Sequence, residues 1–480
     1  MSFSKEKVFS NLIWRFLERS GAQLVALIVS VVLARILSPE DYGTIALITV
    51  FINILNVFVD SGLGSALIQK KDADNTDFST VFYTNVIFCI ALYILMFVIS
   101  PFLAEFYSRP ELVPIIRVLS ITILVSGVKN IQQAYVSRTL QFRKFFFSTL
   151  AGTIIAAVAG IWMAYHGFGV WALVAQQVTN LFIDTIILWI TVKWRPEFVF
   201  SFKRLKSLFS YGWKLLVSAL LDTFYTNLYN LVIGKKYSAN DLAFYTKGEL
   251  FPKAAVGNIN NAIDSVLLPT MSSEQDNKER VKQMTRRAIK TSTFCIAPLM
   301  MGLAGCSQNV ISVLLTDKWL PAAPYLVIFC ITYMFYPIHT SNLNAIKAMG
   351  RSDLFLKLEV AKKIVGLSVL FCTMWFGVKV MAYSLLFVSV TSQIINTWPN
   401  KKLLGYGYLD QLKDIFPGII MAVVMGIIVS FGVYIPVVKG VQLVIQIAVG
   451  IAVYILGSKL FRLDSFYYIE NILVKKFLHK

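Results

Sequence analysis

The feature that most constrains this chain is a series of about fourteen apolar segments separated by short polar stretches. Each is close to the ~20 residues that an α-helix needs to cross a hydrocarbon core about 30 Å thick. Helices satisfy their backbone hydrogen bonds internally, as lipid requires. We therefore expect an all-α polytopic membrane protein with spans at residues 12–34, 43–60, 81–101, 115–136, 148–165, 169–192, 209–234, 242–268, 288–314, 322–346, 354–376, 378–398, 416–434 and 441–460.

Composition agrees with this interpretation. Hydrophobic residues make up 57% of the chain and charged residues 15%, whereas a soluble domain has about 25% charged residues. The N-terminal residues lack a short apolar core followed by a small-residue cleavage site, so we expect the first span to be retained. The five cysteines lie in apolar segments and the three histidines are scattered, so we expect no disulfide, metal site or cofactor.

The net charge of +19 is best explained by topology. In membrane proteins, Lys and Arg concentrate in cytoplasmic loops. Most of the 45 Lys and Arg residues fall in alternate loops on the side that also holds both termini. We therefore expect both termini in the cytoplasm and no nucleic-acid partner. The opposite loops contain few cations: Arg35, Arg109, Arg117, Lys235, Lys236, Lys318, Lys379 and Lys439.

Several other cations fall in or at the edge of the predicted spans. A cation at the bilayer centre costs about 2.5–3.5 kcal/mol on the insertion scale, so it usually faces a partner or a water-filled cavity. Nearby carboxylates such as Glu249 and Glu359 could neutralise some of these cations, and long side chains near helix ends can reach the headgroups. The candidate cavity cations are Arg15, Arg19, Lys129, Lys214, Lys247, Lys253, Lys362 and Lys363.

Polar residues also repeat at helical spacing, which places them on single faces. These stripes occur on at least four predicted helices and indicate one shared hydrated interior. Their members are Arg15, Arg19 and Gln23; Gln176, Asn180 and Asp184; Lys214, Ser218, Asp222 and Tyr225; and Lys253, Gly257, Asn260, Asn261 and Asp264.

A weak internal repeat suggests two halves. A shift of 200 residues pairs Ser38-x-x-Asp41 with Ser238-x-x-Asp241 and Phe51 with Phe251. We therefore expect a six-helix half at residues 1–200, a second at 201–403, and an additional helix pair with a basic tail at 404–480. Duplicated halves are a common transporter plan, in which one half rocks against the other around a central site.

Residues 33–72 carry a resemblance to a known family. This segment contains SPEDYG at 38–43 and DSGLG at 60–64, and it resembles the start of bacterial Wzx-type polysaccharide exporters and flippases. Their superfamily also holds the lipid II flippase and the multidrug and toxin extruders. With the helix count and the two-half plan, the resemblance covers essentially the whole chain.

The resemblance implies a flippase of the bacterial inner membrane. Such a protein moves undecaprenyl-pyrophosphate-linked oligosaccharide repeat units from the cytoplasmic to the periplasmic or outer leaflet by alternating access, for lipopolysaccharide O-antigen, capsule or exopolysaccharide assembly. Related flippases keep required basic residues in the first helix, the region of Arg15 and Arg19. A polysaccharide polymerase and a chain-length regulator are expected partners from the family alone.

The residues are compatible with that chemistry. Lys and Arg can replace the water around a pyrophosphate, and amide side chains can hydrogen-bond sugar hydroxyls or, alternatively, join helices. Candidate sugar contacts are Asn130, Gln133, Gln176, Asn227 and Asn342. Outward movement of a net-anionic lipid gains about 2.3 kcal/mol per charge per 100 mV. Coupling to an inward cation is an alternative, and its candidate carboxylates are Asp60, Asp184, Asp222 and Asp264.

Two other functions are alternatives. A cation-coupled multidrug exporter of the same superfamily would usually have twelve helices and a carboxylate-lined pocket, whereas Lys predominates inside these spans. A membrane-embedded polysaccharide polymerase would usually have a long outer loop. No GxxxxGK[ST] phosphate-binding loop occurs in the sequence, and we expect the protein not to be an enzyme.

Overall fold

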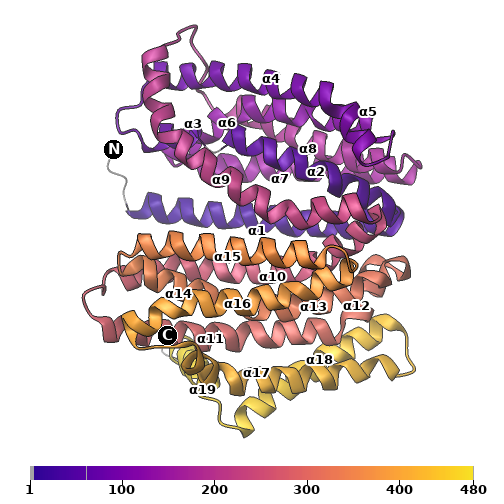
Figure 1. Ribbon diagram of the computed structural model, residues 1–480, viewed down its shortest axis with the longest axis vertical. Coiled ribbons are helices and arrows are strands. Elements are labelled where there is room, and N and C mark those ends of the chain that lie inside the picture. The colour runs from indigo at the N-terminus through magenta and orange to yellow at the C-terminus, as the bar shows by residue number, and fades with distance from the viewer. Residues whose placement is uncertain (1–4, 61, 479–480) are drawn as a thin grey trace. The chain divides into compact units, whose positions relative to one another are not determined.

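The computed structural model describes the backbone of residues 5–60 and 62–478. Within these ranges the chain is helical apart from turns and short connections, and it contains no strand (Figure 1). The expected all-α polytopic fold is confirmed. The chain divides into two compact units, Met1–Ala243 and Phe244–Lys480, and the predicted division at residues 200 and 403 stays a prediction.

The first unit contains nine helices among its described residues. They are α1 (Lys5–Ile36), α2 (Pro39–Asp60), α3 (Leu63–Gln69), α4 (Asn75–Phe106), α5 (Leu112–Leu119), α6 (Ile121–Thr139), α7 (Phe142–Tyr165), α8 (Val170–Thr191) and α9 (Phe202–Lys236). Helix α10 (Ala239–Ser272) begins in this unit and continues into the second.

The second unit continues with long helices and two short 3₁₀ turns. They are α11 (Lys278–Gly305), α12 (Ser307–Leu315), η1 (Asp317–Ala322), α13 (Ala323–Met334), α14 (Tyr336–Ala348), α15 (Ser352–Thr373), α16 (Val378–Leu404), α17 (Tyr408–Ser430), η2 (Phe431–Tyr434), α18 (Lys439–Leu460) and α19 (Asp464–Leu478).

Three predicted spans are each divided between helices. Residues 115–136 are split between α5 and α6, and residues 288–314 are split between α11 and α12. Residues 322–346 are split between α13 and α14, where Pro337 lies in the first turn of α14. A proline has no N–H to continue the preceding helix, so it favours a new start there. Hydropathy detects the apolar stretch in each case but not the break.

Ten stretches of the described chain are long and apolar enough to cross a membrane. Helix α1 contributes the shorter apolar part Ser20–Ile36. Helices α9, α10 and α15 are long enough but are absent from these ten. Their sequences carry polar groups predicted to line a cavity: Lys214 and Asp222 on α9, Lys247 and Lys253 on α10, and Lys362 and Lys363 on α15.

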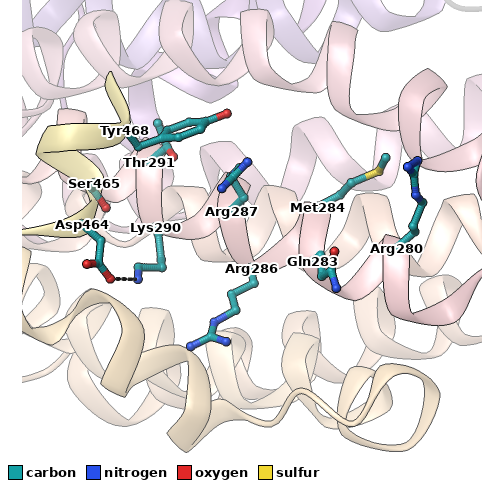
Figure 2. A pocket seen from close by; sticks show the side chains of 10 residues that line it. All are labelled: Arg280, Gln283, Met284, Arg286, Arg287, Lys290, Thr291, Asp464, Ser465 and Tyr468. Atoms are coloured by element: carbon teal, nitrogen blue, oxygen red, sulfur yellow. Dashed lines mark hydrogen bonds and ion pairs between the residues drawn. The ribbon is translucent and has the colours of Figure 1, made fainter. Parts of the chain in front are cut away.

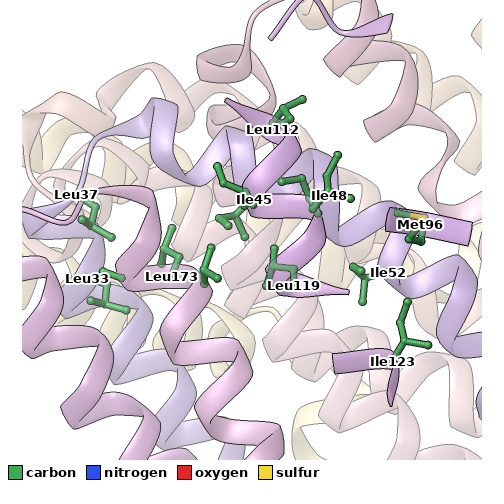
Figure 3. Close-up of a cluster of buried hydrophobic side chains, with 14 of the residues drawn as sticks. Leu33, Leu37, Ile45, Ile48, Ile52, Met96, Leu112, Leu119, Ile123 and Leu173 are labelled. Atoms are coloured by element: carbon green, nitrogen blue, oxygen red, sulfur yellow. The ribbon is translucent and has the colours of Figure 1, made fainter. Parts of the chain in front are cut away.

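Buried apolar side chains hold the helices of the first unit together. One cluster includes Leu33 of α1, Ile48 of α2, Leu119 of α5, Ile123 of α6 and Leu173 of α8 (Figure 3). By contrast, only 22% of the apolar stretch of α4 is buried within the protein. An apolar helix with so much exposed surface is stable in contact with lipid chains.

The repeated Ser-x-x-Asp motif has the same geometry in both places. Ser38 donates its N–H to Asp41 Oδ2 over 2.9 Å, and Asp41 N–H donates to Ser38 Oγ over 3.2 Å. At Ser238 and Asp241 the corresponding distances are 3.2 and 3.1 Å. Each pair forms a reciprocal cap at the start of α2 or α10, so the repeat found in the sequence is also a local structural repeat.

Candidate functional site

Helix α10 carries polar groups that face α13 and α14 within the second unit. Tyr333 Oη donates to Glu249 Oε1 over 2.6 Å. Further along α10, Asn260 Nδ2 donates to Thr340 Oγ1 over 2.5 Å. Asn344 Nδ2 donates to Asp264 Oδ1 over 2.6 Å. Such contacts satisfy polar groups between helices in a membrane, so part of the predicted α10 stripe joins α10 to its neighbours.

Two lysines of α10 have contrasting environments. Lys253 lies one turn after Glu249 at 3.2 Å, but its side chain is 66% exposed. Lys247 is buried, and its Nζ lies 5.7 Å from the ring centroid of Trp319. An aromatic face attracts a nearby cation. Lys253 is therefore accessible to a ligand, whereas Lys247 packs inside the protein.

On α9, Lys214 and Asp222 are both exposed, and Asn227 is half-buried. Asn227 Nδ2 donates to the Thr223 carbonyl of its own helix over 2.8 Å, which leaves the oxygen of the amide available. The structure thus places a predicted cavity cation, a predicted coupling carboxylate and a predicted sugar contact on one helix.

Lys129 of α6 and Asp184 of α8 form an ion pair inside the first unit. Lys129 Nζ lies 2.5 Å from Asp184 Oδ2, and the two side chains are only 13% and 6% exposed. Gly152 lets α7 pack closely against α8 at this point, since a Cβ there would lie 2.9 Å from the Asn180 carbonyl oxygen and 3.2 Å from Asp184 Cβ. The second oxygen, Oδ1, is buried without a hydrogen-bond partner among the described residues. A predicted cavity cation and a predicted coupling carboxylate therefore share one site.

Three other candidates of the first unit, Asn130, Gln133 and Gln176, lie near this pair in sequence. Asn130 is buried beside α3, because a Cβ on Gly64 would come within 2.8 Å of its Oδ1. Gln133 of α6 and Gln176 of α8 are half-buried. The side chains of Arg15, Arg19 and Asp60 lie outside the described part of the structure.

Helix α15 holds the remaining candidate cations. Lys362 Nζ lies 2.6 Å from Glu359 Oε1, one turn earlier, and the two side chains are 15% and 29% exposed. Lys363 is half-buried. The local neutralisation that the sequence offered as an alternative therefore occurs for Lys362.

Asn342 belongs to a buried polar network in the second unit. Its Nδ2 donates to Gln411 Oε1 over 2.8 Å, and its Oδ1 accepts from Asn400 Nδ2 over 2.7 Å. All three side chains are fully buried. This network joins α14, α16 and α17, and a sugar does not reach Asn342 while it is intact. The sequence analysis missed Asn400 and Gln411, although a buried amide requires such partners.

Charged groups at the start of α4 form a second cluster that the sequence analysis missed. Arg204 of α9 donates to Asp74, the N-cap of α4, and this contact lowers the pKa of Asp74 to about 2. Lys70 Nζ lies 2.7 Å from the fully buried Asp77. These contacts fasten α9 to the connection before α4. Among the described residues, no group of three or more His, Cys, Asp or Glu side chains could hold a metal ion.

Comparison with known proteins identifies the family. The family model described as polysaccharide biosynthesis protein matches residues 32–324, more than half of the chain. The chain belongs to this family. It is 27% identical to the teichuronic acid biosynthesis protein TuaB of Bacillus subtilis, with 80% of each chain covered. It is 24% identical to the succinoglycan biosynthesis transport protein ExoT of Rhizobium meliloti, covering 72% of this chain and 70% of that one.

A solved structure supports the same assignment for the fold. The chain superposes on the inward closed conformation of the lipid II flippase MurJ with a TM-score of 0.76, covering 94% of this chain and 99% of that one at 15% identity. The resemblance to polysaccharide exporters is therefore confirmed, and this member of the family is a multi-pass membrane protein.

Proposed function

We propose that this protein is a flippase for undecaprenyl-pyrophosphate-linked oligosaccharide repeat units. It moves them from the cytoplasmic to the periplasmic or outer leaflet of the bacterial inner membrane, for O-antigen, capsule or exopolysaccharide assembly. The observation that carries the proposal is the exposure of Lys214 and Lys253 on α9 and α10, two long helices that carry polar groups along their length. In lipid, an exposed cation on such a helix requires water or an anionic ligand.

The pyrophosphate is the natural ligand for these cations. Charge-assisted hydrogen bonds from Lys to phosphate oxygens replace hydration and are about twice as strong as neutral ones. Lys253 retains exposed surface despite its contact with Glu249, so it can exchange that contact for a phosphate. Arg15, Arg19 and Lys363 complete the proposed cationic cavity on the basis of the sequence pattern. Lys247 is buried and would join it only after a rearrangement of the helices.

The sugars require hydrogen-bonding groups that are not already used inside the protein. Gln133, Gln176 and Asn227 retain partly exposed side chains and are the preferred candidates. Asn130 and Asn342 are buried, so they would contribute only after a rearrangement of the helices. Because Asn342 is bonded to Asn400 and Gln411, its role in the described structure is to hold α14, α16 and α17 together.

The membrane potential supplies a driving force in this proposal. Outward movement of each negative charge gains about 2.3 kcal/mol per 100 mV, so hydrolysis of ATP is unnecessary and the protein does not act as an enzyme. Among the candidate coupling carboxylates, Asp184 has the environment most suited to proton or cation exchange, because its Oδ1 is buried beside a lysine. A polymerase and a chain-length regulator would use the product on the far side.

The test is complementation of a gene deletion in the native host, with undecaprenyl-linked intermediates measured by mass spectrometry. The deletion should accumulate a complete, unpolymerised repeat unit, and the native gene should remove it. Lys253→Gln and Lys214→Gln should each slow removal about tenfold, the effect expected for loss of a charge-assisted contact worth about 1.4 kcal/mol. Lys278→Gln, a change of an exposed lysine at the first position of α11, is the matched control and should complement fully.

Two outcomes would contradict the proposal. Normal removal of the intermediate by both glutamine variants would show that the exposed lysines do not handle the anion. An unchanged lipid profile combined with new sensitivity to cationic drugs would indicate a multidrug exporter. A leaflet-access assay on the accumulated lipid separates a flippase from a polymerase, since only loss of a flippase leaves the repeat unit on the cytoplasmic side.

A further inference from the structure

A basic cavity of about 600 Å³ lies between α11 and the start of α19, within the second unit (Figure 2). The polar first half of α11 and the residues after α18 supply its walls, and none of the candidate cavity cations belongs to it. Its lining residues are Arg280, Gln283, Met284, Arg286, Arg287, Lys290, Thr291, Asp464, Ser465 and Tyr468.

Four of these ten side chains are cationic, and their charges are balanced to different degrees. Arg286 donates to both oxygens of Asp414 over 2.7 Å, a forked pair that holds the guanidinium in place. Lys290 lies 3.1 Å from Asp464, whose side chain is 85% exposed. Exposed ion pairs of this kind contribute about 0–1 kcal/mol to the stability of the fold. Lys290 can therefore exchange Asp464 for an anion that binds it more tightly.

Arg287 is the least balanced cation of the cavity. Its guanidinium carbon lies 4.1 Å from the ring centroid of Tyr468, and no carboxylate partner occurs among the described residues. The aromatic contact orients the planar group without neutralising it. Figure 2 shows Arg287 and Lys290 on the same helix, with Thr291 near Tyr468 and Ser465 next to Asp464. All four line the cavity, so two cations and two hydroxyls border it.

A second, smaller cavity adjoins the basic one. It shares Lys290, Asp464 and Ser465 with the first, and its remaining lining includes Phe294 and Phe461. Ile415, Pro417 and Leu463 add further apolar lining, and Thr293, Asp414 and Arg462 add polar or charged groups. A cationic cavity that is bordered on this side by apolar side chains, including Phe294, Phe461 and Leu463, matches a ligand with a charged head and hydrocarbon chains.

The position of α19 supports the same ligand. At 15 residues it is too short to span a bilayer, and it begins only a few residues after the apolar helix α18. It therefore lies where the chain leaves the hydrocarbon region, the depth at which phospholipid phosphates occur. The exposed side chains of Leu460 and Phe461 precede it.

We propose that the α11–α19 cavity binds the phosphate of an anionic membrane phospholipid, with its acyl chains along the adjoining apolar side chains of Phe294, Leu460 and Phe461. Arg287 and Lys290 bind the phosphate oxygens, Thr291 and Ser465 donate hydrogen bonds, and Arg286 stays paired with Asp414 at the cavity wall. This site is separate from the proposed substrate cations and does not depend on the proposed function.

The test uses detergent-purified full-length protein and native mass spectrometry to measure bound lipid. Phosphatidylglycerol should bind at least tenfold more tightly than phosphatidylcholine of the same chains. Arg287→Gln and Lys290→Gln should each weaken phosphatidylglycerol binding five- to tenfold, and Lys278→Gln, outside the cavity on the same helix, should leave it unchanged. Asp464→Asn should strengthen binding by removing a competing anion, a gain that misfolding would not produce.

The remaining measurements decide the source of the phosphate. Inorganic phosphate and glycerol phosphate, added in excess, should displace little phosphatidylglycerol, because they lack the acyl chains. Effective displacement by either would indicate a site for free anions and would overturn the lipid assignment. The assignment would also be overturned if phosphatidylcholine bound as tightly as phosphatidylglycerol. It would be overturned as well if Arg287→Gln bound phosphatidylglycerol with the affinity of the unchanged protein.

Discussion

At the scale of single residues, the Lys129–Asp184 pair shows how two opposite charges can be buried together inside a membrane protein. Both side chains are almost fully enclosed and lie 2.5 Å apart. Each ion alone would be costly in this environment, and the other compensates for it. The sequence assigned one to substrate binding and the other to ion coupling, whereas the structure makes them mutual counter-ions.

Removing one partner of this pair should destabilise the protein strongly. Lys129→Gln leaves Asp184 charged and enclosed, and we expect a loss of about 3 kcal/mol, seen as a lower melting temperature of the purified protein. The double variant K129Q/D184N should recover most of that loss, since two neutral amides can hydrogen-bond. If the single and double variants are equally unstable, the two residues are not coupled.

The same double variant separates stability from transport. A pair that only stabilises the fold predicts normal removal of the lipid-linked intermediate once folding is restored. A pair that exchanges protons or cations predicts a folded protein that fails to remove it. Asp184 Oδ1, buried without a partner among the described atoms, is the atom at which such exchange would occur.

At the scale of elements, close helix contacts depend on glycine at particular positions. Helices α11 and α17 approach so closely that a Cβ on Gly426 would lie 2.8 Å from the Met301 carbonyl oxygen. A Cβ on Gly302 of α11 would meet only Met425 Cε, at 3.5 Å. The first is a backbone obstacle that cannot move alone, and the second is an ordinary contact.

These two positions therefore predict opposite effects of alanine. Gly426→Ala should destabilise the protein by about 1–3 kcal/mol through overpacking. Gly302→Ala should be neutral or stabilising by up to about 1 kcal/mol, because alanine favours the helix. Melting temperatures of the two purified variants check this. A greater loss for Gly302→Ala than for Gly426→Ala would show that the α11–α17 contact differs from the one described.

At the scale of the whole molecule, the distribution of Lys and Arg predicts the orientation in the membrane. Because Lys and Arg concentrate in cytoplasmic loops, both termini are expected in the cytoplasm. The connection before α18 is then expected on the opposite side of the membrane. Lys439, the first residue of α18 after that connection, pairs with Asp317 over 2.6 Å and has a half-exposed side chain. It offers a reporter position on the outer side.

Cysteine labelling in intact cells checks this orientation. In a variant without native cysteines, Lys439→Cys should react with a membrane-impermeant maleimide, whereas Lys278→Cys should react only after the cells are opened. Both lysines are exposed, so accessibility of the side chain does not distinguish them. The reverse labelling pattern would place the termini outside and would reverse the direction of the proposed transport.

The sequence by itself determined the class of fold, the helical segments and the family, because hydropathy, loop charge and the SPEDYG and DSGLG segments are local patterns. It also anticipated Glu359 as the partner of Lys362, since one helical turn fixes that distance. It did not detect the break between α13 and α14, as an apolar segment has the same hydropathy whether or not its helix is interrupted.

Only the tertiary structure decided which polar groups meet across helices. The partners of Asn342 lie on α16 and α17, and the basic α11–α19 cavity joins residues more than 170 positions apart, such as Lys290 and Asp464 at a separation of 174. Helical spacing defines a face but not its neighbour. The neighbour follows from how the apolar faces pack, and that packing depends on the shapes of many side chains at once.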